Sequence, residues 1–169
     1  MIKKIRTISL SFDKFKSPLG ILYLVFAGMS LVKIEFEKTH GAEPVAPISP
    51  ERVSHSLKMQ LGEYFEGKLR EFSQEVVLLQ GTDFDRKVWL TLKEIPYGET
   101  RSYRWLAERI GNPRAVRAVG QALGRNSIPI ILPCHRIIES NGSIGGYSGG
   151  INIKRRLLDL EYYYTIGVG

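Results

Sequence analysis

Two short helical segments that meet at Gly111-Asn112-Pro113 constrain the fold of this chain more than any other feature of its sequence. The first helix is expected to begin after Ser102, whose hydroxyl can cap a helix N-terminus, and it carries Leu106 on its apolar side. Glycine closes a helix well, while asparagine and proline suit the start of the next one. The pattern predicts a helix-turn-helix; the alternative is an ordinary helical hairpin with a solvated basic face.

The second of these helices, expected over residues 113–123, has two different faces. Its inner stripe is expected to carry Val116, Val119 and Leu123. Polar residues share the other side at spacings of three and four: Arg114, Arg117 and Gln121. Further positions are small: Ala115, Ala118, Gly120 and Ala122. Small residues would let the backbone approach either another helix or a nucleic-acid groove.

The chain is basic, with a net charge of +7, and the excess is concentrated around these helices. Between residues 101 and 125 the acidic side chains are limited to Glu108. Six arginines lie in the same segment: Arg101, Arg104, Arg109, Arg114, Arg117 and Arg125. Guanidinium groups suit bidentate contact with phosphate better than lysines do, so the cluster favours a polyanionic partner.

The first 80 residues alternate between strand-like runs and turns. Strands are expected over residues 5–12, 21–26, 31–36 and 75–79, with Gly28 marking a hairpin turn. A proline-containing linker over residues 40–50 precedes a helix that starts at Glu51. Its apolar positions recur at helical spacing: Val53, Leu57, Leu61 and Tyr64. We expect an α/β (α+β) fold, with a sheet lobe over residues 1–80 and a helical lobe over residues 81–169.

Some classes of protein are disfavoured. A single cysteine cannot form an internal disulfide or a cysteine-based metal cage. The long apolar run over residues 19–32 is interrupted by glycines, is too short to span a bilayer and lies too far into the chain for a secretory signal. We therefore expect a soluble, cytoplasmic protein without a metal site.

That cysteine is Cys134, within Pro133-Cys134-His135-Arg136. The apolar residues 128–132 predict a buried strand that ends at this motif. A lone cysteine in such a place is often inert core, but the neighbouring histidine and arginine favour the reactive thiolate. Adjacent residues on a strand point to opposite faces, so Cys134 and His135 should not form a direct dyad, and a water or a bend would have to link them.

The last helix, expected over residues 152–163, offers a carboxylate to orient the histidine. Its apolar stripe runs through Ile153, Leu157 and Leu160, and Glu161 follows along it. Glu161 could lie at the border of the stripe in water; if it is buried it needs a partner, and His135 is the candidate. The preceding glycine-rich loop, 142–150, matches no nucleotide-phosphate fingerprint, so we expect no cofactor there and interpret it as the flexible wall of a flat ligand's site.

In order along the chain, these motifs resemble the O6-alkylguanine-DNA alkyltransferases. The resemblance runs from Gly81 to Glu161 and rests on four segments: Ile95-Pro96-Tyr97-Gly98-Glu99-Thr100, Arg117-Ala118-Val119-Gly120, Pro133-Cys134-His135-Arg136 and Gly145-Gly146-Tyr147-Ser148-Gly149-Gly150. The first 80 residues match in their strand-rich pattern and in Ser17-Pro18-Leu19-Gly20. The family's fold implies a ribonuclease-H-like sheet lobe followed by a helical lobe with a winged helix-turn-helix.

The resemblance implies a role for each matching residue. Cys134 would accept the alkyl group irreversibly, His135 would draw off its proton through a water, and Glu161 would orient the imidazole. Asn126 would link the site to the DNA-binding helix, and Tyr103 would donate a hydrogen bond to the departing guanine. The guanine pocket would be lined by Tyr147, Ser148, Pro129 and Gly145. Arg117 would replace the flipped nucleotide, and Ala115, Ala118 and Gly120 would contact the minor groove. Two further residues would bind the DNA: Arg114 and Gln121.

The implied protein is a monomer that acts once on double-stranded DNA containing O6-alkylguanine, and O4-alkylthymine is a further candidate substrate. Ser127 stands where the family commonly has proline, which removes a turn-stiffening residue beside Asn126. Some relatives bind a structural zinc partly through cysteines of the first lobe, which this chain does not have. Relatives that flag damage without repairing it lack the nucleophile, whereas this chain retains Cys134.

Two other functions remain open from the residues themselves. A helix-turn-helix regulator or damage-binding protein without chemistry would explain the arginines but not the positions of Cys134, His135 and Glu161. A cysteine hydrolase or acyltransferase acting on protein would explain the cysteine and histidine but not the basic helix.

Overall fold

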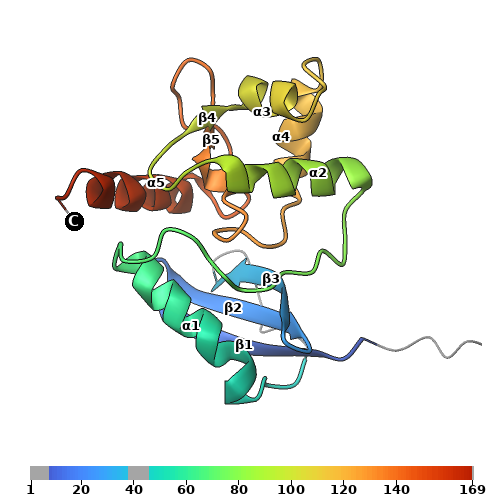
Figure 1. The fold of residues 1–169 in the computed structure, drawn as a ribbon, viewed down its shortest axis with the longest axis vertical. Helices are drawn as coiled ribbons and strands as arrows, with labels where there is room; N and C mark the ends of the chain where they lie inside the picture. Colours follow the sequence, from blue (N-terminus) through green and yellow to red (C-terminus); the bar gives the residue numbers. More distant parts are fainter. Residues whose placement is uncertain (1–7, 38–45, 169) are drawn as a thin grey trace, which may run out of the picture.

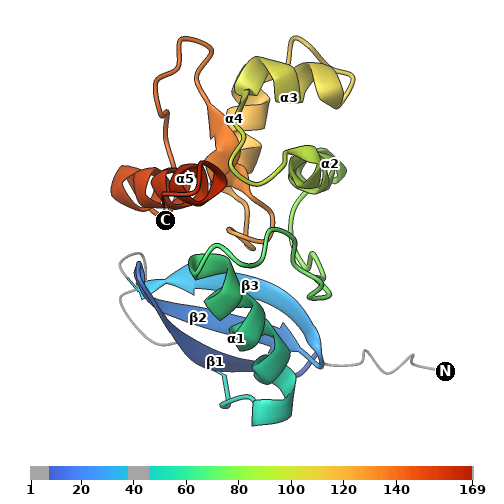
Figure 2. The same cartoon turned by 60° about the vertical axis from the view of Figure 1, so that its left-hand side comes forward.

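The computed structural model of the chain describes residues 8–37 and 46–168 and has two halves (Figures 1 and 2). A sheet covered by one helix forms the first half, and four helices with the loops between them form the second. The mixed α/β class is as expected. In the described residues, no helix is long and apolar enough to cross a membrane.

The sheet is antiparallel in the order β1-β2-β3, with β1 at Leu10–Ser17, β2 at Gly20–Ala27 and β3 at Ser30–Phe36. The expectation of a first strand over residues 5–12 was wrong in its bounds, and residues 5–7 lie outside the described residues. Lys14 and Lys16 are exposed on β1, and an edge strand tolerates charges that face solvent. The turn comes later, where the Ser17 hydroxyl donates to the Gly20 carbonyl oxygen at 2.7 Å.

Helix α1, Glu51–Phe65, covers one face of the sheet as predicted, with Leu57, Leu61 and Tyr64 fully buried. The expected linker before it lies partly outside the described residues. The expected strand over residues 75–79 does not form: β3 meets this segment in a single bridge, Leu31 with Val76. Further along β3, the Ile34 amide donates to the Ser127 carbonyl oxygen at 2.9 Å, so a segment of the second half occupies that part of the sheet edge.

The second half begins with α2, Asp83–Thr91, and a short 3-10 helix, η2, Leu92–Glu94. Thr82 caps α2 and forms a reciprocal capping box with Asp85. The strand β4, Arg101–Ser102, leads into α3, Tyr103–Arg109, where the Ser102 hydroxyl accepts from the Trp105 amide at 3.0 Å.

The next helix, α4, spans Val116–Gly124 and starts three residues later than expected. Asn112 does not cap it: Pro113 and Arg114 form a turn instead, in which the Ala115 amide donates to the Asn112 carbonyl oxygen. This shift leaves Val116 exposed, while Val119 and Leu123 face the core as predicted. Helices α3 and α4 pack against each other and are joined by residues 110–115.

The prediction of a strand over residues 128–132 was wrong. The segment consists of bends and turns, and Ile130 has a φ of 74°, which a β-branched residue rarely adopts and which is incompatible with an extended strand. Cys134 therefore lies on the 3-10 helix η3, Cys134–Arg136, ahead of the two-residue strand β5, Ile137–Ile138. The last helix, α5, spans Ile151–Thr165.

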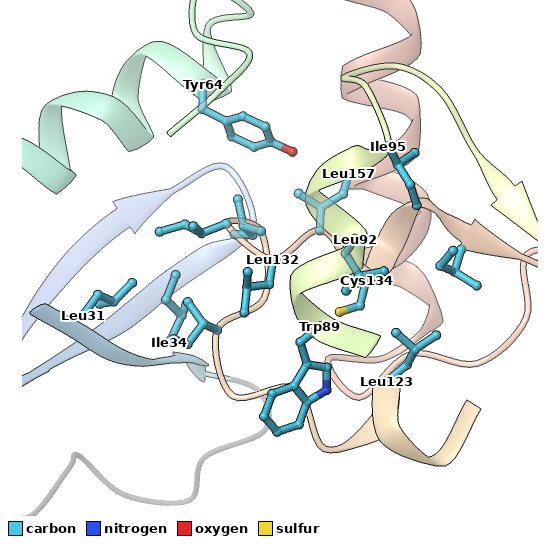
Figure 3. Close-up of a cluster of buried hydrophobic side chains, with 14 of the residues drawn as sticks. Leu31, Ile34, Tyr64, Trp89, Leu92, Ile95, Leu123, Leu132, Cys134 and Leu157 are labelled. Atoms are coloured by element: carbon cyan, nitrogen blue, oxygen red, sulfur yellow. The ribbon is translucent and has the colours of Figure 1, made fainter. Parts of the chain in front are cut away.

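One hydrophobic core joins the two halves. Figure 3 shows Leu31 and Tyr64 of the first half together with Leu92, Leu123 and Leu157 of the second. Cys134 lies within the same cluster and is 4% exposed. The core thus fixes the cysteine-bearing segment between the sheet and the helices.

Candidate active site

The segment that leads to Cys134 is held in place by the side chain of Asn126. Its Nδ2 donates to the Leu132 carbonyl oxygen at 2.8 Å and to the Cys134 Sγ at 3.1 Å, while its Oδ1 accepts from the Ile128 amide at 3.0 Å. Asn126 lies two residues after Gly124, the last residue of α4. One amide group therefore connects this helix to the sulfur.

The Cys134 thiol keeps its proton in the resting protein. Burial raises the pKa of Cys134, against the opposing effects of the Asn126 bond, the nearby Tyr147 hydroxyl and the charge of Lys154. The sequence had suggested that Arg136 would favour the thiolate, which was wrong: this guanidinium is bound to Glu161 and to the Ile95 carbonyl oxygen. A base is therefore needed to remove the thiol proton.

His135, the residue after Cys134, pairs with Glu161 of α5. Both side chains are buried, and His135 Nε2 lies 2.8 Å from Glu161 Oε1. Burial lowers the pKa of His135 although Glu161 opposes the shift, so the imidazole is neutral at neutral pH. An ionised carboxylate can only accept, which assigns the proton to Nε2 and leaves Nδ1 as the acceptor. Among the described residues, Nδ1 has no hydrogen-bond partner.

Glu161 is kept ionised by an unusually complete set of donors. Burial opposes its ionisation, but bonds from His135 and Arg136 outweigh it and hold the pKa of Glu161 well below its usual range. Arg136 donates at 2.9 and 3.0 Å, the Tyr64 hydroxyl at 2.7 Å and the Gly98 amide at 3.1 Å. The sequence did not predict that Arg136, Tyr64 and Gly98 donate hydrogen bonds to Glu161, because no local pattern places them beside a carboxylate on α5.

A cavity of about 220 Å³ opens above the sulfur. It is lined by Tyr103, Gly120, Leu123, Gly124, Cys134, Gly146, Tyr147 and Ser148. Helix α4 thus forms one wall, and the glycine-rich loop forms another. Pro129 and Gly145, which were expected in the pocket, are not among the lining residues, although Gly145 packs directly behind Tyr103.

Burial raises the pKa of Tyr103, with further contributions from Glu139 and Cys134. The Tyr103 hydroxyl therefore keeps its proton and can act as a hydrogen-bond donor at the cavity wall. Lys154 on α5, which the sequence reasoning also missed, places its Nζ 5.9 Å from the centre of the Tyr103 ring. Its position on the helix gave no signal, because lysines are almost always exposed.

The outer side of α4 carries exposed polar residues beside small ones. Arg117 and Gln121 of α4 are exposed, as is Arg114 in the turn before it. The N-cap residue Ala115 is half-buried, as are Ala118 and Gly120 of the helix. The helix is held against α2 by the Trp89 indole, which donates to the Ala122 carbonyl oxygen at 2.7 Å. An ion pair between Arg125 Nη2 and Asp85 Oδ1, 2.6 Å apart, adds a second contact. Among the described residues, no group of three or more histidines, cysteines or acidic residues is placed to hold a metal ion.

Comparison with known proteins gives a consistent picture. A family described as 6-O-methylguanine DNA methyltransferase, DNA binding domain, matches residues 83–163. A methylated-DNA–protein-cysteine methyltransferase of Methanosarcina acetivorans is 44% identical over 149 residues, covering 87% of this chain and 95% of the relative. One of Mycobacterium bovis is 47% identical over 146 residues, covering 86% and 88%.

Solved structures agree with these relatives. The crystal structure of the Mycobacterium tuberculosis O6-methylguanine methyltransferase matches with a TM-score of 0.83 and 44% identity, covering 92% of this chain and 94% of that one. A structure of the Mycobacterium tuberculosis protein OGT in complex with DNA matches with a TM-score of 0.84 and 44% identity, covering 91% and 94%.

Proposed function

The chain belongs to the methylated-DNA–protein-cysteine methyltransferase family, and from this membership we propose a role for each residue of the site around Cys134. The protein repairs alkylated DNA by transferring the alkyl group to a cysteine, and its sequence contains one cysteine. The observation that carries the proposal is the position of that cysteine at a cavity of about 220 Å³, one wall of which is helix α4.

The reaction begins with removal of the thiol proton. His135 accepts it at Nδ1 through a water, and Glu161 stabilises the imidazolium that results. The thiolate then attacks the carbon attached to O6 of the guanine: a C–S bond forms, the C–O bond breaks and guanine leaves with the bonding electron pair. Tyr103 donates a hydrogen bond to the guanine ring and stabilises this charge. The product is a thioether that water does not readily displace, so each chain reacts once.

Helix α4 delivers the base. The exposed Arg117 enters the base stack in place of the flipped nucleotide, and Arg114 and Gln121 contact the neighbouring backbone. Ala115, Ala118 and Gly120 allow the helix to approach the minor groove closely. The protein acts as a cytoplasmic monomer without cofactor or metal.

The finer description of the fold belongs to the same proposal. Residues 1–80 form a ribonuclease-H-like lobe, supported by three antiparallel strands with one covering helix. Residues 81–169 form the alkyltransferase lobe, in which the segment after β5 acts as the wing of a winged helix-turn-helix. The hydrophobic core that joins the lobes supports their acting as one rigid unit.

A substitution at the sulfur tests the proposal. Cys134→Ala should abolish transfer from a duplex with one O6-methylguanine, measured by intact-protein mass spectrometry, and should leave affinity for the same duplex unchanged. This outcome separates an alkyltransferase from a damage-binding protein without chemistry. Transfer that persists in Cys134→Ala would contradict the proposal.

A further inference from the structure

Lys154 is a buried cation whose charge is not balanced by an ion pair. Its side chain is 1% exposed, and its Nζ donates to the Gly146 carbonyl oxygen at 3.1 Å. Among the described residues, no carboxylate lies within ion-pair distance of this Nζ. Burial lowers the pKa of Lys154 to about 8, so nearby charges decide its protonation state at slightly alkaline pH.

Glu139 lies near Tyr103, one of the residues that line the cavity. It follows β5 and opens a turn, in which its amide donates to the Ser143 carbonyl oxygen at 2.9 Å and its carbonyl oxygen accepts from the Gly142 amide at 3.0 Å. A Cβ atom on Gly145 would lie 3.4 Å from Glu139 Oε1 and 2.9 Å from the Tyr103 hydroxyl. The carboxylate and the hydroxyl therefore flank one glycine, and the turn fixes the backbone from which the carboxylate extends.

Burial opposes the charge of Lys154, and several groups around it affect that charge. Glu139 and an ionised Cys134 favour the charge, and the Tyr103 ring offers its face to the ammonium. His135 is close enough for the lysine to lower the pKa of the imidazole. Because Glu139 is exposed, water screens its effect, which is smaller than that of a buried partner.

Resting on the proposed function, we propose that Glu139 is a positioning residue of the transfer reaction, which holds Lys154 as a cation beside the Cys134 sulfur and the Tyr103 ring without touching the substrate. A charged Lys154 favours the thiolate, which is the nucleophile. Its charge above the ring also makes the Tyr103 hydroxyl a stronger donor.

The test is the pH dependence of transfer from free O6-benzylguanine, which removes DNA binding from the measurement. In Glu139→Gln the lysine should lose its proton at lower pH than in the parent. The ratio of parent to variant rate should be close to one at about pH 6.5 and rise to about threefold near pH 8, as expected for a shift of somewhat under one pKa unit. Glu139→Asp should lie between the two.

Two controls make the result specific. Glu108→Gln removes the same charge from an exposed position on α3, the helix of Tyr103, and should keep the parent profile. In a Lys154→Met background, Glu139→Gln should have no further effect on the rate at which iodoacetamide labels Cys134. A parent-to-variant ratio that is constant across pH, or that stays at one throughout, would overturn the inference. Failure of the parent itself to transfer the alkyl group would instead contradict the proposed function.

Discussion

Glu161 Oε1 lies 2.8 Å from His135 Nε2, and this contact decides which nitrogen of the imidazole can act as a base. The carboxylate is fully engaged as an acceptor, so Nε2 carries the proton and Nδ1 is left to receive one. The adjacent cysteine has a pKa raised by burial and cannot ionise without such help. The orientation of one ring therefore controls the reactivity of the sulfur.

Replacing Glu161 by glutamine should slow transfer to both DNA and free O6-benzylguanine. The amide can donate to Nε2 and so favour the wrong tautomer, and the loss of general-base assistance predicts a decrease of about 10² to 10⁴ in rate. The pKa of Cys134, followed by pH-dependent labelling with iodoacetamide, should rise. Asp159→Asn, an exposed substitution on the same helix, is the control. A parent rate with an unshifted thiol titration would remove Glu161 from the mechanism.

Acid should destabilise the protein in two steps. The folded-state pKa of His135 is lowered by burial, so the unfolded chain binds more protons below about pH 6.5 and the free energy of unfolding falls there. The folded-state pKa of Glu161 is also lowered, and its stabilisation is lost as the pH falls below about 4.5. Urea unfolding at pH 7 and pH 5 measures the first step. The difference should shrink in His135→Gln and persist in His55→Gln, which replaces an exposed histidine.

Arg117 should matter for DNA and not for the chemistry. Arg117→Ala is expected to slow repair of a duplex much more than reaction with free O6-benzylguanine, because the free base needs no flipping. Arg52→Ala, an exposed arginine on α1, should change neither rate. Equal losses on both substrates would assign Arg117 to the fold or to the transfer step.

Gly145 and Gly142 form a matched pair in the loop behind Tyr103. Both have positive φ, 69° and 85°, so alanine at either should cost about 1 kcal/mol of stability through backbone strain. A Cβ on Gly145 would lie 2.9 Å from the Tyr103 hydroxyl, whereas nothing lies within 4 Å of one on Gly142. Gly145→Ala should therefore slow transfer to free O6-benzylguanine, and Gly142→Ala should not. Equal rates for the two variants would mean that the position of Tyr103 does not limit the reaction.

The sequence predicted the capped helix α3 and the apolar stripes of α1 and α5, because these follow from local spacing and capping residues. It did not predict the turns before Cys134, since a short apolar run fits a strand as well as a buried loop. The segment includes Ile130 in a left-handed conformation, and it is bound to a distant part of the chain, where the Ile34 amide donates to the Ser127 carbonyl oxygen.

The site was predictable to a similar degree. The motif around Cys134 and the position of Glu161 on the apolar stripe predicted the thiol and the carboxylate that His135 connects. The contributions of Tyr64, Gly98 and Lys154 depend on how α1, the loop before β4 and α5 pack together. Side chains of these types normally serve the core or the surface, and nothing in their sequence neighbours marks them as part of a site.

Stoichiometry tests the central claim most directly. The protein is incubated with an excess of duplex DNA containing O6-methylguanine, and its intact mass is followed with time. The account predicts a gain of one methyl group per chain, located on the peptide that contains Cys134, with repaired guanine formed in equal amount and no further reaction. Repair of more than one guanine per chain, or repair that leaves Cys134 unmodified, would contradict it.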